Sequence, residues 1–298
     1  MSITTTTEVA TTAVPKRAVP TRRVSFEESL ATIERHYALD GELIPSHFFA
    51  ALSSMFPDGE DFFVRSVRHF RSEITDPELS RQVSGFIGQE SIHGREHRAF
   101  NRRLAELGYP TLKFEAFTRW GLKNREKIFT AKANLAATAA LEHFTATLAE
   151  LVLTDEEARM FPGDPAVRDL FLWHALEECE HKSVAFDVYR AVGGSERTRV
   201  VTMKGLRVGL IVGIAAQMLV SLSMDPATYE RGRLRSSFRR FRSTPIFRRA
   251  IWEQLREYDQ PGFHPDDRDT TELAERWREV LFGENGQMLD RLAGSRGV

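Results

Sequence analysis

The residues most suited to chemistry lie in the stretch from Leu170 to Tyr189, which contains His174, Glu177, Glu178 and His181. The stretch has no glycine or proline, and its apolar residues recur at helical spacing, so we predict one helix. His174, Glu178 and His181 stand at positions i, i+4 and i+7 and therefore share one face of that helix. Their neighbours on this face are apolar. A carboxylate and two imidazoles in a core-facing stripe need compensation for lost hydration, and a metal ion provides it.

Three more segments carry related residues. Glu-x-x-His occurs at Glu90–His93 as well as at Glu178–His181. Glu60 precedes apolar residues at i+3, i+4 and i+7, which places it on the apolar face of its helix. Glu142 is the only charged residue between Leu135 and Ala149. Two helices with one Glu each and two helices with Glu-x-x-His form the ligand set of a four-helix bundle around two metal ions.

This set of donors predicts the metals and the role of each side chain. Carboxylate and imidazole donors without thiolate suit iron, manganese or, less well, zinc, and we expect two ions with iron favoured. The predicted metal ligands are Glu60, Glu90, His93, Glu142, His174, Glu178 and His181. We expect Glu60 and Glu178 to be terminal ligands, and Glu90 and Glu142 to bridge the ions.

Two further polar residues lie close to this set. Glu177 is about one turn from His174 and His181, and we expect it to accept a hydrogen bond from a ligand imidazole, with direct ligation as the alternative. His97 follows His93 by four residues. We expect His97 to orient a carboxylate or a bound water, with ligation and plain packing as alternatives.

In these motifs the chain resembles the ferritin-like dinuclear metal–carboxylate proteins, which implies an all-α fold built on a four-helix bundle. More narrowly, the stretches GEDFF, QESIHGREHRAFN, ALEHFTA, WHALEECEHKSVAFDVY and GFHP resemble the bacterial family labelled "predicted metal-dependent hydrolases", from about Pro45 to about Asp267. His-x-x-x-Glu-x-x-His also resembles the arylamine N-oxygenases. Those di-iron enzymes carry an extra histidine one turn before the final motif, and this resemblance implies that His174 is a further ligand.

We expect an enzyme in which a di-iron(II) pair gives electrons to O₂ and a small, apolar substrate is oxidised or oxygenated. A site buried in a bundle supplies movable carboxylates and excludes water. The alternatives are a two-metal hydrolase, in which the ions lower the pKa of a bridging water, and a non-catalytic ferritin-like metal-binding protein. Helical metallohydrolases commonly carry a His-Asp doublet, and this sequence has none.

The elements that must position these residues are helices. We expect bundle helices over about 60–74, 77–107, 126–153 and 170–189, and a connector over 111–123 that covers one end of the bundle. Thr138, Ala139, Thr145 and Ala146 flank Glu142, and their small side chains either leave volume beside the metals or allow tight helix packing. His143 lies off the face of Glu142, so ligation by it is not expected. Cys179 is expected to be a buried packing residue.

Composition sets the remaining expectations. The 298 residues carry a net charge of −1, which gives no bulk attraction to nucleic acid, and one cysteine suits a reducing cytoplasm. Residues 1–24 contain no apolar block of signal-peptide length, and we expect a disordered tail there. Residues 25–192 are expected to form the helical bundle with the metal site, and residues 193–298 to form further helices packed on it.

The sequence of residues 205–249 allows several structural interpretations. Residues 205–224 are apolar except for Arg207, Gln217 and two serines near the end, which suits a buried helix packed on the bundle, an in-plane helix or a membrane span. The stretch Glu230–Arg249 carries eight arginines interleaved with phenylalanines. Such a stretch fits either a solvated helix face or an anionic membrane surface, so peripheral membrane contact is an expectation. We also expect the chain to form a homodimer.

Overall fold

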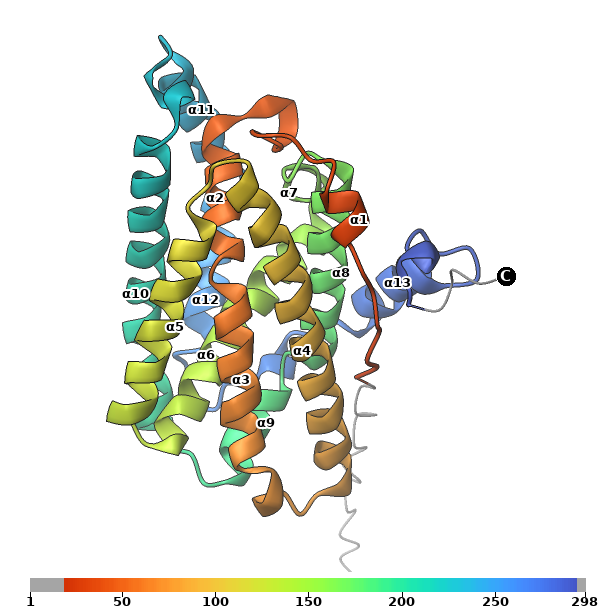
Figure 1. Cartoon of the computed structure of the whole chain (residues 1–298). Helices are drawn as coiled ribbons and strands as arrows, with labels where there is room; N and C mark the ends of the chain where they lie inside the picture. Colours follow the sequence, from red (N-terminus) through yellow and green to blue (C-terminus); the bar gives the residue numbers. More distant parts are fainter. Residues whose placement is uncertain (1–18, 294–298) are drawn as a thin grey trace, which may run out of the picture.

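The computed structural model describes residues 19–293, and every regular element in that range is helical (Figure 1). The α-helices are α1 (Glu27–Leu30), α2 (Leu43–Ser53), α3 (Phe56–His69), α4 (Pro77–Glu106), α5 (Thr111–Ile128), α6 (Ala131–Thr154), α7 (Glu156–Met160), α8 (Pro165–His181), α9 (Val184–Ala191), α10 (Glu196–Ser223), α11 (Arg233–Arg242), α12 (Arg249–Glu257) and α13 (Thr271–Phe282). Two 3₁₀ turns, η3 (Pro226–Tyr229) and η4 (Pro245–Phe247), matter below. The all-α prediction is confirmed.

Four helices, α3, α4, α6 and α8, carry the predicted metal ligands. In the packing, α3 lies against α4 and α6, and α8 lies against α6 and α4. Figure 1 shows the long helices aligned along a common axis. Local sequence fixes where two of them begin: the carboxylate of Asp76 accepts the amide of Glu78, and that of Asp164 accepts the amide of Ala166, each before a proline in the first turn.

The helix boundaries differ from the predicted ones in three places. Helix α3 begins at Phe56, because Pro57 is tolerated in the first turn of a helix and does not break the chain there. The expected connector is itself helix α5, which extends to Ile128, so the third bundle helix begins at Ala131 and not near residue 126. The predicted single helix over 170–189 is α8 followed by α9, with the helical hydrogen bonding interrupted at Lys182 and Ser183 while both keep right-handed backbone angles.

We expected a disordered tail up to residue 24, but residues 19–24 make defined contacts with the rest of the protein. Arg22 forms ion pairs with Glu177 and Glu180. The Pro20 carbonyl accepts a hydrogen bond from Gln89. Val24 is fully buried and forms an isolated antiparallel bridge with Leu292. The segment therefore packs against α4 and α8, because its polar groups are matched to theirs; residues 1–18 lie outside the described part of the chain.

Helix α10 does not match the first of the three alternatives for residues 205–224, a buried apolar helix. It packs on α6 and α2 by one face, but most of its apolar side chains on the other face are exposed. Within residues 19–293 it is the one helix whose length and hydropathy would suffice to cross a membrane, and 17% of its most apolar window is buried. Helix α12 packs on α6 and α13 packs on α8, so all three elements contact the helices of the site. The division of the chain at residue 192 stays a prediction.

Candidate metal centre

The structure brings all the predicted ligands into one buried cluster. Glu60 comes from α3, the pair Glu90 and His93 from α4, Glu142 from α6, and His174, Glu178 and His181 from α8. Each of these residues is 0–4% exposed. Their donor atoms form overlapping groups, within 4.8 Å of one another, that could each hold a metal ion: Glu60, Glu90 and His93; His93, His174 and Glu178; Glu90, Glu142 and His181.

The two ends of the cluster are each built around one histidine of α8. At one end, Nε2 of His181 lies 3.0 Å from Oε1 of Glu90 and 3.2 Å from Oε2 of Glu142. At the other end, Nε2 of His174 lies 2.9 Å from Oε1 of Glu178 and 3.8 Å from Oε1 of Glu60. Glu178 lies between the two ends, because the same oxygen is 3.5 Å from Nε2 of His181. The arrangement therefore has two adjacent groups of donors with a shared carboxylate.

Many polar atoms of this cluster are buried without a hydrogen-bond partner among the described residues. The unpaired atoms are the two carboxylate oxygens of each of Glu60, Glu90 and Glu142, together with Oε2 of Glu178, Nδ1 of His93 and Nε2 of His181. An unpaired buried polar atom costs about 1–3 kcal/mol, so a stable protein does not gather this many by chance. All of them are metal-ligating atoms, and they converge on the same volume. Bound metal ions would satisfy them, so the residues present fit a metal site.

Electrostatics support the same interpretation. Burial, with the charges of neighbouring carboxylates added to it, raises the pKa of Glu60 and Glu142 well above the ordinary glutamate value. A bound cation counteracts both effects, since it attracts the charged form. Burial and the neighbouring His174 lower the pKa of His93 well below the ordinary histidine value. That ring is therefore neutral, which is the form that ligates metals.

Glu177 lies outside the cluster of ligating atoms and contacts it through His93. Nε2 of His93 donates to Oε2 of Glu177 at 3.0 Å. Oε1 of Glu177 accepts from Arg22 at 2.9 Å, so the carboxylate is held from the other side. Burial raises the pKa of Glu177 to about 8, whereas the ion pair with Arg22 favours the ionised carboxylate, whose oxygens can only accept hydrogen bonds. Because Nε2 of His93 carries the proton, its Nδ1 is left with a free lone pair that faces Glu90 and Glu178.

His181 is oriented by a similar contact from α4. Its Nδ1 lies 2.8 Å from Oε1 of Gln89, which can only accept, so Nδ1 carries the proton and Nε2 is left for the cluster. The amide nitrogen of Gln89 donates to Glu180 at 2.9 Å, which fixes which way the amide points. Glu180 is in turn paired with Arg22 and Arg278. Arg22 thus supports the partners of two site histidines.

A chain of hydrogen bonds orients His174, and the donor and the acceptor of each bond can be assigned in turn from Asn101 to His174. The amide group of Asn101 donates to Glu115, so its oxygen accepts from the hydroxyl of Ser53 at 2.7 Å. The hydroxyl oxygen then accepts from Nδ1 of His97 at 2.8 Å. Nε2 of His97 is left to accept from Nδ1 of His174, also at 2.8 Å. Nε2 of His174 therefore presents a lone pair to Glu60 and Glu178, while both nitrogens of His97 are occupied.

Sequence reasoning missed the outer residues of these contacts. Gln89 precedes Glu90 directly, so its position beside a predicted ligand was a usable signal. Ser53 and Asn101 gave no signal, because their contacts join α2 to α4 across the fold. Arg22 was assigned to the expected tail. His143 behaves as expected: its Nε2 donates to the Gln254 carbonyl, outside the cluster.

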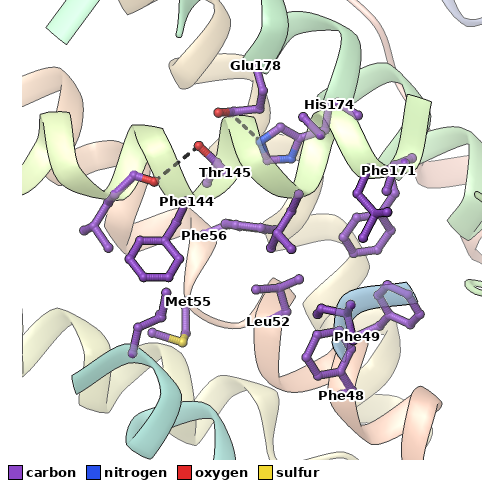
Figure 2. A pocket seen from close by; sticks show the side chains of 18 of the residues that line it. Phe48, Phe49, Leu52, Met55, Phe56, Phe144, Thr145, Phe171, His174 and Glu178 are labelled. Carbon is purple, nitrogen blue, oxygen red and sulfur yellow. Dashed lines mark hydrogen bonds and ion pairs between the residues drawn. The ribbon is translucent and has the colours of Figure 1, made fainter. Parts of the chain in front are cut away.

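An apolar cavity of about 200 Å³ adjoins the cluster. Figure 2 shows His174 and Glu178 on one side of it and the aromatic and aliphatic side chains of Phe48, Phe49, Leu52 and Phe144 on the others. Glu60 also lines it. Of the four small residues predicted to leave volume near Glu142, Thr145 lines the cavity and the other three do not. None of the lining residues is a lysine or an arginine, so the cavity suits an uncharged, apolar molecule.

A second group of potential metal ligands, His36, His47 and Asp225, has a different character. Oδ2 of Asp225 is 2.8 Å from His36, 3.0 Å from His47 and 3.1 Å from Arg35. Arg233 contacts the other nitrogen of His36 at 3.0 Å. Arg35 already pairs with this carboxylate and Arg233 lies against His36, and both arginines would repel a cation. The group is an ion-pair cluster that joins α2 to the end of α10.

Comparison with known proteins gives one match. A family model described as "predicted metal-dependent hydrolase" matches residues 20–269. No curated protein and no solved structure matches the chain at a significant level. The matched range contains every residue of the cluster, together with Arg22. With this extent of match and a buried group of glutamates and histidines able to hold metal ions, the chain belongs to the family of predicted metal-dependent hydrolases.

Proposed function

We propose that the chain is a dinuclear non-haem metal enzyme and that α3, α4, α6 and α8 form a ferritin-like bundle around the metals. The proposed ligands are Glu60, Glu90, His93, Glu142, His174, Glu178 and His181. The observation that carries this proposal is the convergence of buried, unpartnered carboxylate and imidazole atoms from all four helices. Iron is the favoured metal, because the donors are oxygen and imidazole nitrogen without thiolate.

Within this proposal the outer residues hold the ligands in place. Glu177, Gln89 and His97 each fix the proton on one nitrogen of a ligand histidine, so that the other nitrogen faces the metals. The carboxylates of Glu60 and Glu142 are bound by no hydrogen bond within the described residues and are therefore able to change position. Helix packing around the cluster excludes water.

The reaction that this geometry supports best is O₂-dependent oxidation or oxygenation of a small apolar molecule. A bound di-iron(II) pair would supply two electrons to O₂, and an external reductant would be needed to restore them. The chain's own residues bind the substrate: the cavity places an apolar molecule against His174 and Glu178, at the edge of the proposed metal site. The large aromatic content of the cavity wall fixes its shape.

The second candidate is two-metal hydrolysis, and the description of the family favours it. In that reaction the same residues would hold two ions, and these would supply an activated water for the cleavage of an ester or amide. The absence of lysine and arginine from the cavity lining argues against phosphoesters and other anionic substrates. A neutral ester of an apolar acid remains compatible with the lining.

One experiment separates the two candidates. Protein loaded anaerobically with Fe(II) is mixed with O₂ while oxygen consumption and the optical spectrum are recorded, and the zinc form is assayed against neutral aryl and alkyl esters. We expect the iron form to consume O₂ faster than free Fe(II) in the same buffer, and the zinc form to be inactive. An inert iron form together with ester cleavage by the zinc form would replace the oxidase with the hydrolase.

A further inference from the structure

The outer face of α10 is apolar over most of its length. Val208, Val212 and Leu219 are 60–70% exposed, and Ile211 and Val220 are also exposed. No charged residue occurs between Val208 and Met224, a length of about 25 Å in a helix. Monomeric soluble proteins rarely expose a continuous apolar face of this length, so we expect another molecule or a membrane to cover it.

The inner face of α10 is fixed to the rest of the protein by polar contacts. The side-chain oxygen of Gln217 accepts from Ser54 at 2.9 Å, and Ser221 contacts His47 at 2.6 Å. Arg207 is paired with Asp259 at 2.9 Å. Helix α10 cannot cross a bilayer without breaking these contacts or carrying α2 with it. Its exposed face can therefore meet a membrane only in the plane of the surface.

The segment that follows α10 supplies cationic groups beside this face. Turn η3 contacts both α10 and α11, and both helices pack on α2. On α11, Arg235, Arg239 and Arg242 are exposed and, within residues 19–293, no hydrogen bond or ion pair joins them to another residue. Phe238 lies among them and is 54% exposed. Exposed arginines around an exposed aromatic ring are typical of contact with lipid headgroups.

The charge of this region is local rather than a property of the whole chain. Residues 197–249 contain twelve lysines and arginines and two acidic residues, although the whole chain carries a net charge of −1. The rest of the chain is accordingly acidic. Several of these arginines pair with acidic residues, as Arg207 does with Asp259 and Arg240 with Asp40, so the local positive charge rests on the exposed arginines of α11.

The same region forms part of the cavity wall. Leu210 of α10, Phe241 of α11 and Ile246 of η4 all line the cavity beside the metal cluster. Helix α5 lines it with Thr118 and Leu122 and carries a stacked, exposed pair, Phe117 and Trp120, with ring centroids 5.8 Å apart. The walls of the cavity thus continue into exposed apolar and aromatic side chains.

We propose that the face formed by the exposed side of α10 and the arginines of α11 docks in plane on the surface of a membrane that contains anionic lipids. The apolar side chains enter the boundary between headgroups and acyl chains, and the arginines pair with the anionic headgroups. Docking places the wall of the cavity at the membrane, where apolar molecules concentrate. This binding does not depend on the chemistry of the metal site, so the two are tested separately.

The test is flotation of the purified full-length chain with vesicles of phosphatidylcholine alone or phosphatidylcholine mixed with phosphatidylglycerol. We expect binding to the mixed vesicles, much weaker binding to the neutral ones, and release by high salt or carbonate. Arg235→Glu/Arg239→Glu is expected to weaken binding by roughly 30-fold or more, because each basic residue lost near an anionic surface costs about fivefold. Val212→Ser/Leu219→Ser is expected to abolish stable flotation.

The matched control is Arg81→Glu/Arg102→Glu, the same charge change on two exposed arginines of α4. It should bind as the unmodified chain does, and thermal unfolding should show all variants folded. Absence of binding to the mixed vesicles, or equal loss in the α4 control, would overturn the proposal. So would a carbonate-resistant membrane fraction. A dimer in light scattering that Val212→Ser/Leu219→Ser converts to a monomer would make a second copy the occupant instead.

Discussion

Nε2 of His93 lies 3.0 Å from Oε2 of Glu177, and this contact assigns the proton to the ring nitrogen that faces away from the carboxylate cluster. Nδ1 is then available to a metal. Removing the acceptor by Glu177→Ala frees the ring to rotate or to change tautomer, and the loss of such a partner typically costs about 10–100-fold in metal affinity. Metal titration of the variant measures that loss.

Glu150→Ala is the control for this change, because Glu150 is also a carboxylate paired with an arginine, but it is only partly buried and lies outside the cluster. Its metal affinity should be that of the unmodified chain. Unchanged affinity in Glu177→Ala would show that His93 does not need this partner, and would remove Glu177 from the account of the site.

A second prediction concerns His174. Its Nε2 presents a lone pair to Glu60 and Glu178, so His174→Ala removes a neutral donor but leaves both Glu-x-x-His motifs. Two metals should still bind, one of them more weakly, and the reactivity with O₂ should fall. In a structure with metals bound, His174 Nε2 should lie about 2.0–2.3 Å from one ion. A ring turned away from both ions would contradict ligation.

Gly59 gives a test of the cavity. It lines the cavity, and a Cβ atom added there meets no atom within 4 Å, so Gly59→Leu places its side chain in the empty volume without a clash at Cβ. We expect apolar substrates or probes to lose binding by at least about tenfold, while the metal content is unchanged. Gly121→Leu is the control, because Gly121 lies in α5, also has open space at Cβ and does not line the cavity. Equal binding in both variants would show that this cavity is not the substrate site.

Stability at mild acidity should depend on His47. Burial, against the opposing effect of Asp225, lowers the pKa of His47 to about 4 from an ordinary value of 6.5. The folded chain therefore binds fewer protons at this site than the unfolded chain between these two pH values, and stability falls as the pH drops from 6.5 towards 4. At pH 5 the loss is about 2 kcal/mol.

Urea unfolding of the unmodified chain and of His47→Gln at pH 7 and pH 5 measures this contribution. The stability difference between the two pH values should shrink by about 2 kcal/mol in the variant. His36 and Arg35 share the Asp225 carboxylate, whose pKa is lowered to about 2, so that carboxylate does not titrate in this range. An identical pH dependence in both proteins would contradict the assignment.

The sequence predicted the helices of the site and the residues that meet there, because both follow from local patterns. Helical spacing placed His174, Glu178 and His181 on one face, and Asp76-Pro77 predicted the start of α4. Helix boundaries were less predictable near Pro57 and Lys182, where the local signals were ambiguous. The orienting partners were harder to predict, because Ser53 and Arg22 reach their contacts only through the packing of distant segments.

The outer face of α10 could not be predicted from its composition. A run of apolar residues around Val212 and Leu219 has the same sequence signature in a buried helix, an in-plane helix and a membrane span. Only the packing of the helix on α6 and α2 determines which side chains remain exposed. The sequence did identify the basic stretch that follows, but not that three of its arginines have no partner within the described residues.

The central claim is a dinuclear site, and counting metals tests it most directly. The purified chain is loaded anaerobically with Fe(II), freed of excess metal by desalting, and analysed for iron and protein in the same sample. The account predicts about two iron ions per chain, and about one or none after Glu90→Ala, which removes the carboxylate shared by two of the donor groups. One ion or none in the unmodified chain after full loading would contradict it.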